Sequence, residues 1–189
     1  MTIVQLLISA LLVMANGFFV VAEFSLTRVR PTQLVEWEHD GRLGAASVRH
    51  AVEHLDAYLS ACQLRITIAS LGLGAVGERA LKELLQPAMG DLGLAGSAGL
   101  AGAIAFAGIT LTHVVAGELA PKSIAIARTE QAALALAPVM RLFYRVTRPF
   151  VDLFNVMGNL LLKPFGIPPA RADRQAWSQV QQLRSMLGS

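Results

Sequence analysis

Three long runs with almost no charged side chain alternate with shorter segments of mixed character along this chain of 189 residues. The runs cover about residues 3–27, 57–77 and 92–117. A helix rises about 1.5 Å per residue, so each run is long enough to cross a bilayer core of about 30 Å. The pattern therefore predicts an all-α integral membrane protein with three transmembrane helices.

Composition supports the membrane class. Only 15% of the residues are charged, where a soluble domain carries about 25%, and the mean hydropathy is +0.52. The first run lacks a preceding basic segment and a following small-residue cleavage site, so we interpret it as a retained span rather than a signal peptide. No basic module of the kind that binds nucleic acid is visible, and a nucleic-acid partner is not expected.

The segment 131–163 is hydrophobic but contains charged residues at regular intervals. Arg141, Arg145 and Arg148 divide it into uncharged pieces of about ten residues, and Pro149 is expected to break it. Pieces of that length do not span a membrane, whereas amphipathic helices that lie in the interface have this composition. We predict interfacial helices here.

The segment 31–55 has a similar pattern, with apolar residues at near-helical spacing and charged residues between them. We expect Gly41 and Gly44 to bend it. An interfacial helix pair and a small soluble helical hairpin both fit this pattern.

The distribution of lysine and arginine predicts the orientation. Of the 16 basic residues, thirteen lie either between the first two spans or after the third, and with three spans these segments share one side. Because basic loops stay in the cytoplasm, we expect a multi-pass protein of the cell membrane with its N-terminus outside and its C-terminus in the cytoplasm.

Polar and small residues inside the spans recur at steps of three and four, which places them on one helical face. The residues are Asn16, Glu23 and Thr27 in the first span, Ser60, Gln63, Thr67, Ser70, Gly74 and Gly77 in the second, and Thr110, His113 and Gly117 in the third. We expect these faces to turn toward one another. Ordinary close packing of helices through small residues is the alternative.

Two carboxylates, Glu23 and Glu118, lie within or at the end of a span. An acid inside a membrane costs about 2.5–3.5 kcal/mol on insertion scales and is a functional candidate by default, although both could simply lie at the interface. Gly117 and Pro121 flank Glu118 and predict a break in the third helix, which would free backbone carbonyls. Carbonyls, one carboxylate and nearby serine hydroxyls form an all-oxygen set suited to a hard cation such as Mg²⁺.

Softer metals fit this sequence less well. The single cysteine, Cys62, lies inside the second span and offers neither a disulfide framework nor a cysteine cluster. His113 is the only imidazole in a span, and we interpret it as a hydrogen-bonded packing residue rather than a ligand.

Three stretches resemble the signature blocks of a known family. "NGFFVVAEFSLTRVR", "YLSACQLRITIASLGLGAVGE" and "HVVAGELAPKSIAIARTE" are similar, in order and spacing, to blocks of the cyclin M/CorC membrane domain, also called domain of unknown function 21 or hemolysin-like. The resemblance covers about residues 1–170, and we expect residues 171–189 to begin a linker toward cytoplasmic domains. A nucleotide-binding module is such a domain in full-length relatives.

The resemblance implies a homodimer in the lipid bilayer, with three spans per protomer and a belt of juxtamembrane helices. It implies Mg²⁺ transport, in the direction of efflux, with Na⁺ entry as the coupled movement. It also implies a dehydrated Mg²⁺ held by oxygens from all three spans. Carried over block by block, the ligands are Ser25, Ser70, the Gly117 carbonyl and Glu118.

Further residues are expected to support this site or to line a path. Asn16 and Glu23 would be supporting polar residues, Thr67 follows the polar stripe of the second span, and Lys122 would be a counter-charge. Two positions depart from the family pattern: Ser70 stands where many relatives have Asn, and Arg65 where close relatives have Gly. On a helical wheel Arg65 lies opposite the polar stripe, so we expect it to face lipid or a partner protomer.

Two other classes of function remain open. A Mg²⁺-sensing membrane scaffold or regulator would need the same binding site without transporting the ion. An enzyme is not expected, because the sequence contains no Ser-His-Asp set, zinc-protease motif, phosphate-binding loop or nucleophile elbow.

Overall fold

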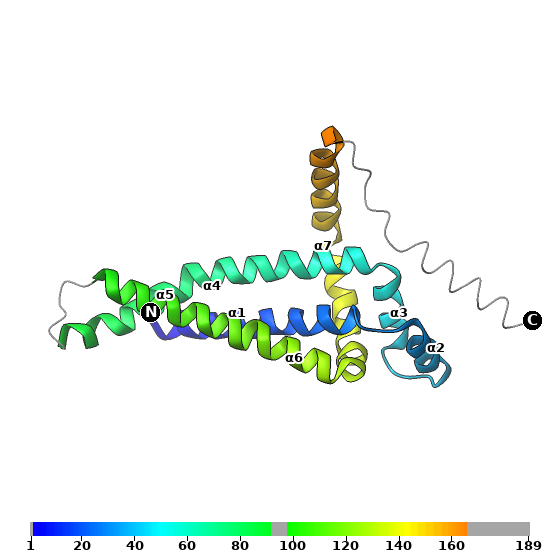
Figure 1. The fold of residues 1–189 in the computed structure, drawn as a ribbon, viewed down its shortest axis with the longest axis horizontal. Helices are drawn as coiled ribbons and strands as arrows, with labels where there is room; N and C mark the ends of the chain where they lie inside the picture. Colours follow the sequence, from blue (N-terminus) through cyan, green and yellow to red (C-terminus); the bar gives the residue numbers. More distant parts are fainter. Residues whose placement is uncertain (1, 92–97, 166–189) are drawn as a thin grey trace, which may run out of the picture. The chain divides into compact units, whose positions relative to one another are not determined.

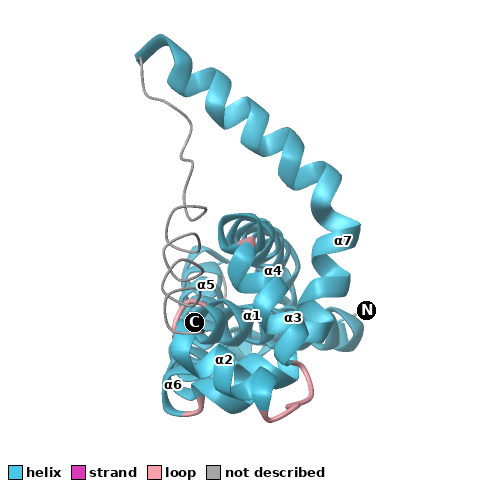
Figure 2. Ribbon diagram, turned by 90° about the vertical axis from the view of Figure 1, so that its right-hand side faces the viewer, coloured by secondary structure: helices cyan, strands magenta, loops and turns pink. Residues whose placement is uncertain are grey.

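The computed structural model describes residues 2–91 and 98–165, and every regular element in these ranges is a helix (Figures 1 and 2). The predicted all-α membrane class is confirmed. The predicted linker at 171–189 and the beginning of the predicted third span lie outside the described residues. In chain order the elements are α1 (Thr2–Leu26), α2 (Pro31–His39), α3 (Ala45–Glu53), α4 (Leu55–Asp91), α5 (Ala98–Thr112), the π-helix η1 (His113–Leu119), α6 (Ala120–Ala127), α7 (Thr129–Leu162) and the short 3₁₀ helix η2 (Lys163–Phe165).

Three helical stretches are long and apolar enough to cross a membrane: Ile3–Leu26, Leu55–Pro87 and Gly99–Ala127. The sequence predicted all three spans, but the helices run further than the apolar runs. α4 continues well beyond residue 77, since charged residues end a hydrophobic run without ending a helix. The third span continues to Ala127 through the predicted break.

The described residues form two compact units. The first contains Met1–Val21 and Arg65–Ala125, and the second contains Ala22–Leu64 and Ile126–Ser189. Helices α1 and α4 each contribute residues to both units.

In the first unit, glycines let the helices approach closely. A Cβ on Gly17 of α1 would lie 3.0 Å from Cγ of Pro121 in α6, and one on Gly77 of α4 would lie 3.2 Å from Oγ of Ser9 in α1. Small residues at such points allow close backbone packing between membrane helices. This packing brings the polar residues of α1, α4 and η1 together.

Arg65 also belongs to the first unit. Its guanidinium carbon lies 5.7 Å from the ring centroid of Phe19 on α1, a cation–π contact. The expectation that this side chain faces only lipid or a partner was therefore wrong. The helical wheel gave the direction of Arg65 on α4, but it carried no information about the aromatic ring of α1.

In the second unit, α3 packs against the first half of α7. Ala45, Val48, Ala51 and Val52 form the buried face of α3. α7 continues as one helix through Pro138 and Pro149 (Figure 2), so the predicted break at Pro149 was wrong. A proline removes one backbone hydrogen bond, and the other bonds of this long helix keep it continuous.

The connection between α2 and α3 uses both predicted bending glycines. Gly41 and Gly44 have positive φ angles of 63° and 92°. At Gly44 a Cβ would lie 2.2 Å from the carbonyl oxygen of Leu134 on α7. Glycine is therefore required at residue 44 by backbone conformation and by space.

Candidate cation-binding site

Asn16 is fully buried on α1 and reaches the π-helix. Its Nδ2 donates a hydrogen bond to the carbonyl oxygen of Gly117, at 3.0 Å. In an α-helix this carbonyl would accept from the residue four positions later, but that residue is Pro121, which has no N–H. The amide of Asn16 thus supplies a donor that the helix itself lacks.

The other atom of the same amide is left without a partner. Oδ1 of Asn16 is buried and accepts no hydrogen bond within the described part of the chain. Turning the amide over would place this oxygen against the Gly117 oxygen, so the hydrogen bond fixes which atom points away. A buried acceptor without a donor is rare in folded proteins.

His113 links two further polar groups of the first unit. Its Nε2 lies 3.2 Å from Oγ of Ser70 on α4 and 3.1 Å from Oε1 of Glu118. The hydroxyl of Ser70 donates to the carbonyl of Ile66, at 2.9 Å, and a carboxylate only accepts. The hydrogen shared by these groups therefore sits on Nε2, while the buried Nδ1 has no partner among the described residues.

The π-helix explains why His113 and Glu118 meet. Five residues advance an α-helix by about 1.4 turns, which separates the two side chains around its axis. In a π-helix the hydrogen bonds run from residue i to i+5, so residues five apart stack above one another. The predicted break between Gly117 and Pro121 was thus wrong in form, because the chain widens into a π-helix and continues.

Gly117 lies between the imidazole and the amide. A Cβ at this position would lie 3.3 Å from Nδ1 of His113 and 3.4 Å from Nδ2 of Asn16, tighter than most real Cβ contacts. The absence of a side chain lets both groups approach the backbone of η1.

Three spans thus bring oxygen atoms to one place in the first unit: Oδ1 of Asn16, Oγ of Ser70, the carbonyl of Gly117 and the carboxylate of Glu118. His113 is largely buried, with 13% of its side chain exposed, whereas Glu118 is 46% exposed. The carboxylate therefore lies on the accessible side of the cluster. Across residues 2–91 and 98–165 no three His, Cys, Asp or Glu side chains form a metal cluster.

The remaining predicted site residues lie elsewhere. Ser25 and Glu23 belong to the second unit. Ser25 is fully buried and its Oγ donates to the carbonyl of Ala22 at 3.0 Å, while Glu23 is half-buried. Thr67 is exposed on α4 and Lys122 is exposed on α6.

The polar stripe of α4 does not face inward as a whole. Within the first unit Ser70 and Gly77 contact neighbouring helices, whereas Thr67 and Gly74 are exposed. A period of three to four residues places groups on one side of a helix but does not define how wide the packed part of that side is.

Sequence reasoning assigned Asn16 a supporting role and treated His113 as a packing residue. His113 is hydrogen-bonded, as expected, but it contacts two of the proposed ligands. The spacing of Gly117 and Pro121 was the available signal for the carbonyl that Asn16 reaches. No residue pattern indicated the π-helix that brings His113 to Glu118.

Comparison with known proteins gives a consistent family. Residues 7–189 match the Cyclin M transmembrane N-terminal domain. The chain is 39% identical over 189 residues to the UPF0053 protein YhdP of Bacillus subtilis, covering 99% of this chain and 42% of that protein. It is 40% identical over 185 residues to the UPF0053 protein YhdT of the same organism, covering 97% of this chain and 40% of the relative.

A mycobacterial relative shows the same pattern. The uncharacterized protein Rv1841c of Mycobacterium tuberculosis is 37% identical over 163 residues, covering 86% of this chain and 47% of that protein. The chain thus spans less than half the length of these curated relatives. Its match to the domain extends over nearly all of its residues, and the chain belongs to the cyclin M/CorC family, as a cyclin M transmembrane N-terminal domain.

Proposed function

We propose that this membrane domain binds Mg²⁺ and carries it across the bilayer, with Asn16, Ser70, Gly117 and Glu118 as oxygen donors. The observation that supports this most is the buried Oδ1 of Asn16, which has no partner within the described residues. Leaving such an acceptor unsatisfied costs about 1–3 kcal/mol. A bound cation would offset that cost and use the oxygen.

The chemistry of the donor set suits a small hard cation. Mg²⁺ prefers oxygen ligands and is commonly bound by one or two carboxylates. Glu118 supplies a negative charge, and Ser70 presents its lone pairs because its hydrogen is directed to Ile66. His113 competes with the cation, since its Nε2–H points at two of these donors. Binding requires the imidazole to release them.

The wider proposal keeps the sequence-based expectations. Ser25 is retained as a ligand on the strength of its sequence block, with Glu23, Thr67 and Lys122 as support or path residues. A homodimer, an outside N-terminus, efflux and Na⁺ as the coupled ion complete the proposal. Cyclin M and UPF0053 membrane domains are not a known enzyme family, and we propose transport rather than catalysis.

A flux measurement in liposomes tests the proposal. The purified chain is reconstituted with a Mg²⁺-sensitive dye inside and assayed with and without a Na⁺ gradient. Glu118→Gln keeps the size of the side chain but removes its charge, and we expect flux to fall to the level of empty liposomes. Glu53→Gln makes the same change at an exposed position on α3 and is expected to retain full flux.

Two outcomes would contradict transport through this site. Full flux in Glu118→Gln would reject the site. Mg²⁺ binding by the unchanged chain, measured calorimetrically, without any flux would instead favour the Mg²⁺-sensing scaffold.

A further inference from the structure

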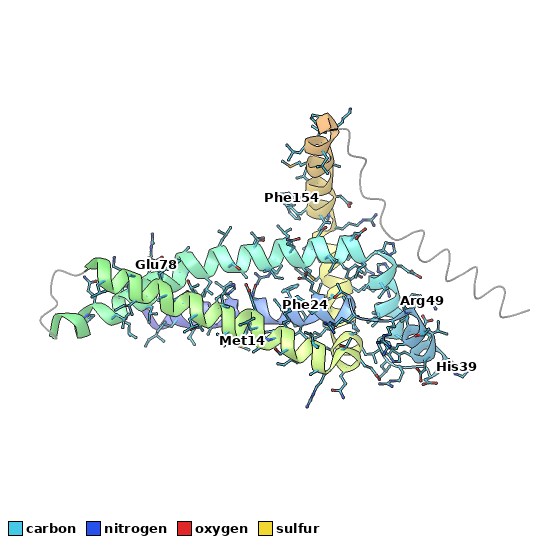
Figure 3. All side chains as sticks on the ribbon, viewed as in Figure 1. Met14, Phe24, His39, Arg49, Glu78 and Phe154 are labelled. Carbon is cyan, nitrogen blue, oxygen red and sulfur yellow. The ribbon has the colours of Figure 1, made fainter. Side chains whose placement is uncertain are left out.

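Helix α7 carries an exposed apolar stripe. Six residues recur along it at steps of three or four and are each between 51% and 66% exposed: Val139, Leu142, Val146, Phe150, Leu153 and Met157. At about 3.6 residues per turn these positions lie on one side of the helix. Phe154, labelled in Figure 3 on the part of α7 beyond Pro149, borders the stripe and is 52% exposed.

The opposite side of α7 is basic. Arg141, Arg145 and Arg148 follow one another at steps of four and three, roughly half a turn away from the apolar stripe. Nε of Arg148 lies 3.6 Å from Oδ2 of Asp152, and even with this carboxylate the side keeps a positive balance. We call these three residues the arginine face.

A stacking contact fixes where α7 lies along a membrane span. Tyr58, in the first turn of α4, stacks on Tyr144 of α7 with ring centroids 4.6 Å apart and an angle of 27°. The apolar stretch of α4 that is long enough to cross a membrane begins at Leu55. The middle of α7 is therefore attached where a span begins, which is the boundary between hydrocarbon and headgroups.

A third side of α7 is already covered, with Ala133, Ala137 and Met140 fully buried. The stripe therefore needs a separate occupant. At the end of a membrane span acyl chains are the available apolar phase, and a helix with one apolar and one cationic side binds in the interface of anionic bilayers. Charge complementarity to the arginine face selects anionic headgroups.

We propose that α7 is an interfacial helix whose apolar stripe lies among acyl chains and whose arginine face selects anionic lipid headgroups. This goes beyond ion transport, because it makes the lipid composition of the membrane a specific ligand of the domain. An arginine near an anionic surface contributes about a fivefold preference. The three arginines together give α7 a clear selectivity over zwitterionic lipid.

A single tryptophan reporter tests both parts of the proposal in the full chain. Phe154→Trp is introduced together with Trp37→Phe and Trp177→Phe, and the protein is reconstituted in vesicles. Brominated phosphatidylcholine and brominated phosphatidylglycerol quench tryptophan that touches their acyl chains. We expect strong quenching by both lipids and a higher apparent affinity for phosphatidylglycerol.

Charge variants identify the cause of the selectivity. Replacing Arg141, Arg145 and Arg148 by Gln should make the two lipids quench equally, while overall quenching persists and shows that the helix remains in place. Arg79→Gln removes an exposed charge from the distal part of α4 and should leave the selectivity unchanged.

Three results would overturn the proposal. Equal quenching by the two lipids in the unmodified background would remove the headgroup part. Red-shifted emission without quenching would place the stripe in water. Blue-shifted emission without quenching would place it against protein, as in contact with a second copy.

Discussion

The side-chain amide of Asn16 on α1 donates a hydrogen bond to the backbone carbonyl of Gly117 in the π-helix, 101 positions later in the sequence. This bond ties the first span to the third inside the first unit. It also directs Oδ1 of Asn16 away from Gly117, where it is buried without a partner within the described residues. One hydrogen bond thus determines both the contact between the helices and the direction of the candidate ligand.

Gly117→Ala should weaken Mg²⁺ binding. The added methyl group would lie 3.3–3.4 Å from His113 and Asn16, so the amide must shift and its hydrogen bond, which contributes about 0.5–1.5 kcal/mol, is strained. We expect a loss of affinity of up to about tenfold, measured by calorimetric titration. Gly74→Ala adds the same group where no atom lies within 4 Å, and it should bind normally. Equal affinities would contradict the proposed geometry.

His113→Leu should strengthen Mg²⁺ binding. The imidazole N–H occupies the oxygens of Ser70 and Glu118, and a hydrogen bond to a charged group contributes about 1.5–3 kcal/mol. Removing it frees both donors, and we expect the dissociation constant to fall about tenfold or more in the same titration. A higher dissociation constant in this variant would show that the imidazole orients the ligands instead of competing with the ion.

Gly44→Ala should destabilise the second unit strongly. The residue has a left-handed backbone, which costs about 1–2 kcal/mol for an L side chain, and the Cβ would overlap the carbonyl of Leu134. Gly41→Ala carries a similar backbone cost at a position with open space. We expect the melting temperature of the chain in detergent to fall much further for Gly44→Ala. Comparable shifts for the two variants would argue against the contact between α3 and α7.

The second unit should lose stability as the pH falls. Burial lowers the pKa of His50 from its ordinary value of 6.5, and the charges of His54 and Arg141 lower it further, against a smaller opposing effect of Glu53 and with Arg145 adding slightly. The unfolded chain therefore binds this proton at a higher pH than the folded chain. Stability is complete above about 6.5 and decreases below it.

Melting temperatures across the pH range check this prediction. Nδ1 of His50 lies 3.0 Å from the hydroxyl of Tyr58, and the imidazole also contacts the rings of His54 and Tyr144. His50→Phe keeps an aromatic ring there and should flatten the dependence between about pH 6.5 and lower values. His39→Gln, at a side chain that is 89% exposed, should leave the dependence as it is. An unchanged slope in His50→Phe would exclude this residue as the cause.

The three spans could be predicted because uncharged apolar runs of about twenty residues are typical of membrane helices and rare in soluble folds, but their ends could not. Glu78 and Arg79 end the second apolar run, yet both residues favour helix, and α4 continues. Pro149 was expected to break α7, but a helix that is packed along part of its length tolerates one missing hydrogen bond. Hydropathy describes the solvent around a helix better than it describes where the helix stops.

The polar residues of the candidate site could be named from the sequence, but their partners could not. The spacing of Gly117 and Pro121 indicated a carbonyl without its helical donor, which agrees with the bond from Asn16. The contact between His113 and Glu118 depends on a change of helical period inside one segment. No periodicity argument that assumes a single period can anticipate it.

The seven residues of η1 hold one more residue than the same hydrogen-bonded span of α-helix would need. Deleting a single residue there, such as Ala116, would let the segment relax to ordinary α geometry and rotate everything after it by about a quarter of a turn. Pro121 would then swing away from Gly17, and a different side of α6 would meet α1. The orientation of the last quarter of the third span is therefore set by a count of residues, and a length change in this segment is a more severe lesion than most substitutions.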